Sequence, residues 1–253
     1  MAKKLRDYSI FNRFNFERKP VGVKFLITKP EGIKRRGKGL NFCEMFKEAQ
    51  TSEPFYVGEE DFECIEPMIL GMKDPEPILV SGYVGERENI YSEARANRKI
   101  YQYLPKMIKG SVRYVAFAPI DQLTFDPDVL IITANLDQAR TILRALGYSS
   151  GENWSSQGTP VAACTWLYLY PVLSGKLNFT ITGLSFGMQS LKVLPEGLFL
   201  ISIPWQLLPE IMENLQDMDW NLPMKGGTRD ENRERVQKLF KQFRQELAKD
   251  RNQ

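Results

Sequence analysis

The sequence contains no histidine, although it is 253 residues long. This absence excludes Ser-His-Asp and Cys-His nucleophile pairs, HExxH metalloproteases and every metal site that uses an imidazole ligand. Any acid–base chemistry must therefore come from Asp, Glu, Lys, Tyr or Cys side chains. No catalytic residue can be named on these grounds, and whether the protein is an enzyme stays open.

Long hydrophobic runs are also missing. The most apolar stretch, VAACTWLYLYPVL at residues 161–173, contains a proline and is shorter than the roughly 18 residues that indicate a membrane-spanning helix. The N-terminal stretch MAKKLRDYSIFNRFNFERKP is interrupted by charged residues every few positions, so it lacks the apolar part of a signal peptide. The sequence therefore predicts a soluble, cytoplasmic protein without a membrane partner.

Neither sign of charge dominates the chain. It has 34 basic and 31 acidic residues, which gives a formal net charge of +3, and both signs are scattered along the sequence. This balance is too mild to indicate binding to nucleic acid. The partners that remain are a small molecule or metal ion, a second copy of the chain, or another protein.

Cysteine is scarce as well, since the chain has three, two of them in the stretch NFCEMFKEAQTSEPFYVGEEDFEC (41–64). A reducing cytoplasm argues against disulfides between Cys43, Cys64 and Cys164. Their spacing lacks the compact CxxC pattern of zinc knuckles and ferredoxins. If folding brings the thiols together, they can bind zinc with one open coordination position, or an iron–sulfur cluster with one open iron. The alternative is that they fill the apolar core.

Hydrophobic periodicity divides the chain into short strands and amphipathic helices. Strands are expected at the runs 21–27, 77–84, 112–117, 128–134, 177–182 and 198–203. Helices are expected at 40–50, 59–70, 92–109, 135–147 and 204–218, and residues 161–173 are expected to be buried. This mixture predicts an α+β or α/β protein.

A similar order of elements occurs twice. Each half offers strands, a cysteine-bearing apolar segment, a glycine-containing turn (SGYVG and TGLSFG) and a closing helix. We therefore expect one compact domain over residues 1–224, built of two similar αβ halves at about 19–122 and 123–224.

The composition changes after the domain, where residues 225–253 are rich in charge. Apolar residues recur there at helical spacing, namely Val236, Leu239, Phe240, Phe243 and Leu247. An amphipathic C-terminal helix is therefore expected. It either packs on the domain or binds a partner, which includes a second copy of the chain.

Several short motifs occur together in an order that resembles the DUF169 family. They are KPVGVKF, the segments around Cys43 and Cys64, AAC ending at Cys164, and APIDQLTFDPDVLIITANLDQARTILRALGY. The resemblance runs from about Lys19 to Met218. It implies an archaeal or anaerobic bacterial relationship but no particular reaction.

The resemblance also implies site residues. Family members tend to carry cysteines at the positions of Cys43, Cys64 and Cys164, and many have one more in the stretch that matches residues 183–187. This chain reads TGLSFG there, with Gly183, Ser185 and Gly187 but no thiol, which puts a four-cysteine site in doubt.

A polar pair at the start of a predicted helix is a further candidate for ligand binding. Asn135 and Gln138 match polar positions in the family's strand-to-helix turn, and ligands often bind at the carboxyl ends of strands. Helix capping explains both residues equally well.

Three functional hypotheses follow. The first is a binding protein that holds a metal or iron–sulfur centre through Cys43, Cys64 and Cys164, with the turn at residues 183–187 near the open position. The second is a metal-free enzyme or small-ligand binder that uses Tyr, Lys and carboxylates in an apolar cavity away from the cysteines. The third is a non-catalytic subunit or scaffold whose interface is the C-terminal helix.

Overall fold

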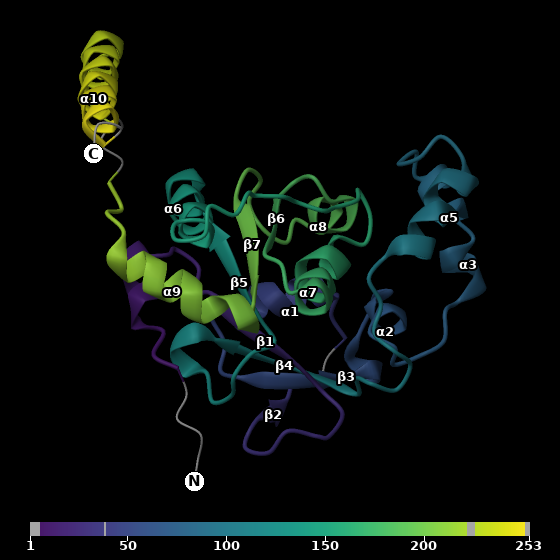
Figure 1. The fold of residues 1–253 in the computed structure, drawn as a ribbon. Coiled ribbons are helices and arrows are strands. Elements are labelled where there is room, and N and C mark those ends of the chain that lie inside the picture. Colours follow the sequence, from purple (N-terminus) through teal and green to yellow (C-terminus); the bar gives the residue numbers. More distant parts are fainter. Residues whose placement is uncertain (1–5, 38, 222–225, 251–253) are drawn as a thin grey trace. The chain divides into compact units, whose positions relative to one another are not determined.

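The computed structural model of the chain describes residues 6–37, 39–221 and 226–250. A seven-stranded sheet lies at its centre, with helices on both faces (Figure 1). The strands are β1 (Val21–Leu26), β2 (Lys34–Arg35), β3 (Phe55–Gly58), β4 (Tyr114–Pro119), β5 (Val129–Ala134), β6 (Asn178–Ile181) and β7 (Phe199–Pro204). This architecture confirms the expected α+β class.

The helices of the chain differ widely in length. They are α1 (Phe42–Ala49), α2 (Glu66–Ile69), α3 (Pro77–Val80), α4 (Tyr83–Arg87), α5 (Ala94–Tyr103), α6 (Leu136–Leu146), α7 (Ala163–Ser174), α8 (Phe186–Ser190), α9 (Leu208–Asp217) and α10 (Arg229–Asp250). Short 3-10 turns are η1 (Ser9–Phe14), η2 (Glu59–Asp61), η3 (Ile120–Gln122) and η4 (Trp205–Leu207).

The strand order is β2-β3-β4-β1-β5-β7-β6. All neighbouring strands are antiparallel except β2 and β3, which run parallel. The two central strands meet with Val21 of β1 opposite Ile131 of β5. Outward from this pair, β4, β3 and β2 follow on one side, while β7 and β6 follow on the other. The organisation into two similar halves stays a prediction.

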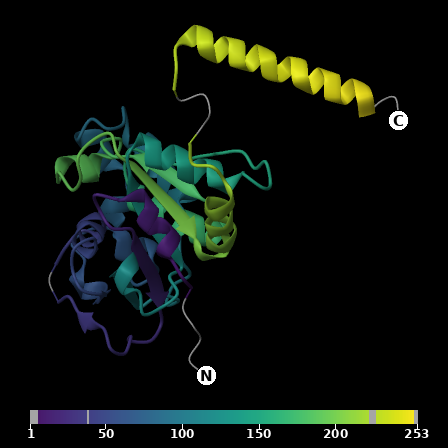
Figure 2. The same cartoon turned by 90° about the vertical axis from the view of Figure 1, so that its left-hand side faces the viewer.

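Side chains of the central strands alternate between two helical layers. Val129 and Ile131 of β5 belong to a core that also contains side chains of α1, α2 and α7. The intervening Leu130 and Ile132 are also buried, on the opposite face, where α6 contacts β5 and β7. Figure 1 shows α6 and α7 on either side of these strands, and Figure 2 shows the same fold turned by 90°.

Residues 77–84, predicted as a strand, are helical. Pro77 occupies the first turn of α3, a position where its missing N–H costs nothing, and the chain then turns at Gly82 into α4. Gly82 has a φ of +87°, and a Cβ there would lie 2.0 Å from the carbonyl oxygen of Ala94. The apolar run therefore bends around α5 instead of extending along a sheet.

Two predicted helices are shorter than expected, for reasons that lie elsewhere in the chain. The helix expected at 59–70 is broken because Phe62 is extended and forms a β-bridge with Leu40. The helix expected at 92–109 ends at Tyr103, since Leu104 adopts an extended conformation before Pro105. Residues beyond it pair with the end of α2, with Met107 donating to the Ile69 carbonyl at 2.9 Å.

The chain divides into two compact units, Met1–Gln216 and Asp217–Gln253. The expected boundary at residues 224 and 225 lies outside the described residues. Within the second unit, α10 is the amphipathic helix predicted from the sequence, and four large apolar side chains are exposed on it: Leu239, Phe240, Phe243 and Leu247. A partner for this helix stays a prediction.

No helix within the described ranges is both long enough and apolar enough to cross a membrane.

Candidate thiol-lined site

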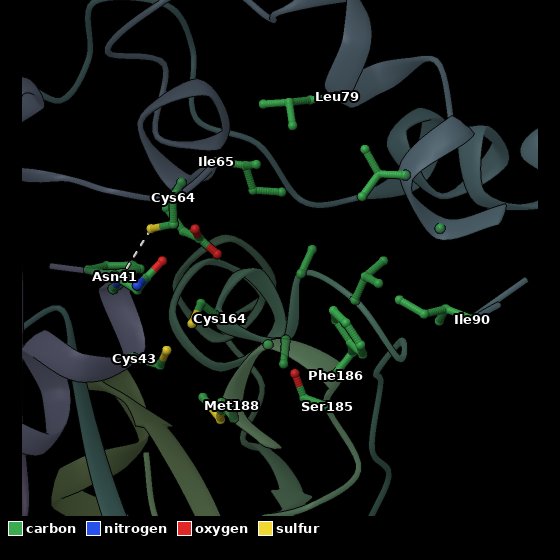
Figure 3. A pocket seen from close by; sticks show the side chains of 18 of the residues that line it. Asn41, Cys43, Cys64, Ile65, Leu79, Ile90, Cys164, Ser185, Phe186 and Met188 are labelled. Atoms are coloured by element: carbon green, nitrogen blue, oxygen red, sulfur yellow. Dashed lines mark hydrogen bonds between the residues drawn. The ribbon is translucent and has the colours of Figure 1, made fainter. Parts of the chain in front are cut away.

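The three cysteines line one pocket, although they come from distant parts of the chain (Figure 3). Cys43 lies in α1, Cys64 precedes α2 and Cys164 lies in α7. The pocket has a volume of about 240 Å³. Cys43 and Cys164 are buried, Cys64 is partly exposed, and all three are free thiols. Folding therefore brings the three sulfur-bearing segments to one place.

The bridge between Leu40 and Phe62 places Cys64 next to the start of α1. Leu40 donates its N–H to the Asp61 carbonyl at 3.0 Å and accepts from the N–H of Glu63 at 3.0 Å. The N–H of Phe42, the first residue of α1, then donates to Cys64 Sγ at 3.2 Å. The local break in the expected helix at 59–70 is thus what directs Cys64 into the pocket.

Cys43 and Cys164 occupy equivalent positions, since each is the second residue of its helix. The N-terminal turn of a helix carries unpaired N–H groups and the positive end of the helix dipole, which stabilise a thiolate. Two such turns face the same pocket, and the N–H of Phe42 is directed at the third sulfur. The backbone therefore favours negative charge at this point.

Glu66, at the start of α2, joins the thiols in the pocket wall. Burial raises the pKa of Glu66, while hydrogen bonds from Cys64 and Cys164 partly oppose the rise. Burial, followed by the neighbouring Glu66 carboxyl, raises the pKa of Cys64. A hydrogen bond to Cys43 is the largest cause of the raised pKa of Cys164, and burial adds to it. Without a cation in the pocket, the ionised forms of these groups are therefore disfavoured.

Positive charge is absent from the described residues of the pocket wall. Among the described residues that line it, none is a lysine or an arginine. Three thiolates and a carboxylate cannot all be ionised here unless a cation balances them. As they stand, the side chains of the described residues form no set of three or more Cys, Asp or Glu that could hold a metal ion. Metal binding therefore needs side-chain rotation at the pocket.

An aromatic pair holds the two cysteine-bearing helices together. The ring of Tyr168 in α7 stacks on Phe42 with centroids 4.0 Å apart, and its hydroxyl donates to the Phe42 carbonyl at 3.4 Å. Tyr168 is fully buried, and burial raises the pKa of its phenol, with Cys164 the next cause. Because Phe42 precedes Cys43 and Tyr168 lies one turn after Cys164, this pair sets the separation of the two sulfurs.

The residues of the turn after β6 divide between the pocket and the surface. Ser185 and Gly187 line the pocket, and Ser185 is buried. Gly183 is not among the lining residues; it lies in the turn with a φ of +96°. The structure thus brings two of the three predicted turn residues to the cysteines.

Asn135 and Gln138 lie outside this pocket and form a capping box at the start of α6. Asn135 Oδ1 accepts from the N–H of Gln138 at 2.9 Å, and Gln138 Oε1 accepts from the N–H of Asn135 at 2.9 Å. The Gln138 amide also donates to the Phe14 carbonyl at 3.0 Å. Helix capping accounts for both side chains.

Three polar residues of the pocket, Asn41, Glu66 and Asn97, were not singled out from the sequence. Glu66 follows Cys64 by two positions, but an acidic residue before a proline is typical of an exposed helix start. Asn97 lies on α5, whose sequence ARANRKIYQY is polar overall, so burial was not expected there. The second hypothesis expected an apolar cavity away from the cysteines. The apolar cavity described here has the cysteines in its wall.

Replacing Glu66 by glutamine tests whether a buried, protonated carboxyl is present. Burial raises the pKa of Glu66 in the folded chain above its value in the unfolded chain, which is about 4.3. As the pH rises from the unfolded pKa toward the folded pKa, the unfolded chain gives up this proton first, so the free energy of unfolding falls. A glutamine at this position cannot ionise, so the free energy of unfolding of Glu66→Gln does not fall in this way. We expect it to be more stable than wild type by about 1–3 kcal/mol near neutral pH, and equal to it near pH 4.

Urea unfolding of both proteins at the two pH values measures this difference. The matched control is Glu63→Gln, which changes an exposed side chain three residues earlier and is expected to alter stability little at either pH. A Glu66→Gln protein that is no more stable than wild type near neutral pH would contradict the assignment.

Comparison with known proteins gives one family match. No curated protein and no solved structure matches the chain significantly. The model of the DUF169 family, described as "Uncharacterised ArCR", matches residues 9–214, which include α1, α2 and α7 and therefore all three cysteines. Because this match spans most of the 253 residues, the chain belongs to the DUF169 family.

Proposed function

We propose that the protein is a binding protein for a thiophilic metal centre, either a single ion such as zinc or an iron–sulfur cluster, held by Cys43, Cys64 and Cys164. The observation that carries the proposal is the convergence of three thiols from separate elements on one pocket. Thiolates are the preferred ligands of both kinds of centre. A reducing, cytoplasmic location, in which the thiols stay free, is part of the proposal.

The surroundings of the sulfurs fit such a centre in their chemistry. Two helix N-termini and the N–H of Phe42 favour thiolates, and hydrogen bonds of this kind orient and tune metal ligands. The described residues of the wall include no lysine or arginine as a counter-charge, so a multivalent cation is the partner that balances ionised thiols.

Three cysteine ligands would leave one coordination position of the metal open for a fourth ligand. Glu66, which contacts Cys64 and Cys164, is the nearest protein candidate, and Ser185 also faces the pocket. Three protein ligands with an exchangeable fourth position are typical of sites that bind or activate a small molecule. When bound, the metal would supply a Lewis-acid or electron-transfer position, and the protein would orient its ligands and exclude water.

Metal content after anaerobic purification tests the proposal. We expect roughly one zinc ion per chain, or iron together with acid-labile sulfide, in the wild-type protein. The variant with Cys43, Cys64 and Cys164 all changed to serine is expected to lose this metal. Leu191→Ala is the matched control, because Leu191 lines the same pocket without a donor atom, and it is expected to keep the metal.

Circular dichroism of the serine variant establishes that it is folded. Wild-type protein that carries no metal, and that takes up neither zinc nor iron with sulfide on reconstitution, would overturn the proposal. Equal metal content in the wild-type protein and the folded serine variant would overturn the role of the cysteines.

A further inference from the structure

The pocket is larger than a metal ion needs, and the side away from the sulfurs is apolar. Leu79, Val84 and Ile90 line that side, together with Phe186 and Leu191. Figure 3 shows Ile90 on the opposite side of the pocket from the three cysteines. A cavity of about 150 Å³ already binds benzene, so about 240 Å³ accommodates a molecule of one or two rings.

The electrostatics of the wall select against anions. The pocket contains one carboxyl group, and the described lining residues include no lysine or arginine. Transfer of a phosphate or carboxylate ligand from water into such a wall is unfavourable without a cationic partner.

One buried polar atom in the wall has no partner. Asn97 is 2% exposed and lines the pocket; its Nδ2 donates to the Gly82 carbonyl at 3.1 Å, while no described residue donates to its Oδ1. The carbonyl of Gly82 fixes the orientation of this amide, because the reversed amide would face two oxygens toward each other. Buried acceptors are rarely left without a donor, so Asn97 Oδ1 is a candidate partner for a ligand that donates a hydrogen bond.

The packing around Asn97 holds the acceptor in place. A Cβ at Gly85 would lie 2.5 Å from Asn97 Nδ2, so α4 approaches α5 closely at this point. Leu79, Val84, Gly85, Ile90 and Asn97 all belong to the segment from α3 to α5. One continuous part of the chain therefore supplies the acceptor and part of the apolar wall.

We propose that the pocket binds a neutral, largely apolar organic molecule of one or two rings that donates an N–H or O–H group to Asn97 Oδ1. The segment from α3 to α5 sets the specificity for this ligand. The inference deepens the proposed function, because the organic molecule would lie beside the metal position of the same pocket. Its recognition does not require that the metal be bound.

Indole and N-methylindole are matched probes for this inference. Both fill a two-ring space, but only indole has the N–H donor. We expect the wild-type protein to bind indole about 3- to 10-fold more tightly than N-methylindole, and an indole carboxylate at least 10-fold more weakly than indole. Isothermal titration or ligand-observed NMR gives these ratios.

Asn97→Leu is expected to bind indole and N-methylindole equally. The matched control Gln102→Leu changes an exposed residue of the same helix and is expected to keep the preference. If Asn97→Leu does not fold, the test uses wild-type protein instead, and NMR follows the side-chain amide signals of Asn97 in an isotope-labelled sample. They are expected to shift with indole and to stay unchanged with N-methylindole.

Equal binding of the two probes by the wild-type protein, binding of neither, or a preference for the carboxylate would overturn the inference. The titrations are repeated on the triple serine variant of the cysteines. An indole preference in a protein that takes up no metal would remove the proposed metal function and leave this inference intact. Metal uptake without any indole preference would overturn the inference and leave the proposed metal function intact.

Discussion

Replacing Tyr168 by alanine is expected to lower the free energy of unfolding by about 3–5 kcal/mol. The ring is fully buried and stacks on Phe42 at 4.0 Å, so its removal leaves a cavity between α7 and α1. For a chain of this size the melting temperature is expected to fall by roughly 6–20 °C, which calorimetry or circular dichroism measures. Because the ring also sets the spacing of Cys43 and Cys164, metal affinity is expected to fall as well.

Tyr168→Phe is the matched control. It keeps the stacked ring and removes only the hydroxyl, whose hydrogen bond to the Phe42 carbonyl is long at 3.4 Å. We expect this variant to lose about 1 kcal/mol or less. If alanine and phenylalanine at this position have the same small effect, the Tyr168–Phe42 contact does not hold the two helices together.

Metal affinity is expected to rise at least about 100-fold when the pH increases from about 6 to about 7. The pKa of Cys64 is raised by burial, and that of Cys164 by its hydrogen bond to Cys43 and by burial, so both thiols are protonated in this range. A metal that binds through their thiolates must release both protons, and each proton changes the affinity tenfold per pH unit. Protons compete with the metal, so the affinity rises with pH.

Cadmium titrations against a competing chelator, corrected for the chelator's own protonation, measure this dependence. Cys64→Ser serves as the control, since it removes one titrating ligand and is expected to reduce the pH dependence by about tenfold per unit. An affinity that changes less than tenfold between the two pH values in wild-type protein would contradict binding through the buried thiols.

The central strands were predictable because their sequences carry enough local signal. VGVKFL, VLIITA and FLISIP are β-branched runs, and each forms a strand within one residue or so of its expected bounds. The helix at 136–146 was equally clear, since Asn135 and Gln138 mark its start. Here local preference and the final packing agree.

The segment that forms the far wall of the pocket was predicted wrongly for a physical reason. PILVSGYV has the composition of a strand, but no described strand pairs with it. It forms two short helices instead, of which α4 packs against α5 and α3 packs against α4. The short strand β3 was missed, since four residues give little periodic signal and its place depends on pairing with β4. Tertiary contacts therefore determine the secondary structure of both segments.

The candidate site shows the same division between local and tertiary information. Cys43, Cys64 and Cys164 could be named as candidates from the sequence, whereas their approach to one pocket depends on the bridge between Leu40 and Phe62 and on the packing of α7 against α1. No local pattern reveals that pairing. The burial of Asn97 similarly depends on the close approach of α4 to α5, which Gly82 and Gly85 permit.

X-ray absorption spectroscopy of zinc-loaded wild-type protein tests the central claim most directly, because it identifies the atoms bound to the metal. Coordination by Cys43, Cys64 and Cys164 predicts sulfur neighbours at about 2.3 Å, about three per zinc ion. A spectrum with only oxygen or nitrogen neighbours, at about 2.0–2.2 Å, would show that these thiols do not bind the metal and would contradict the account.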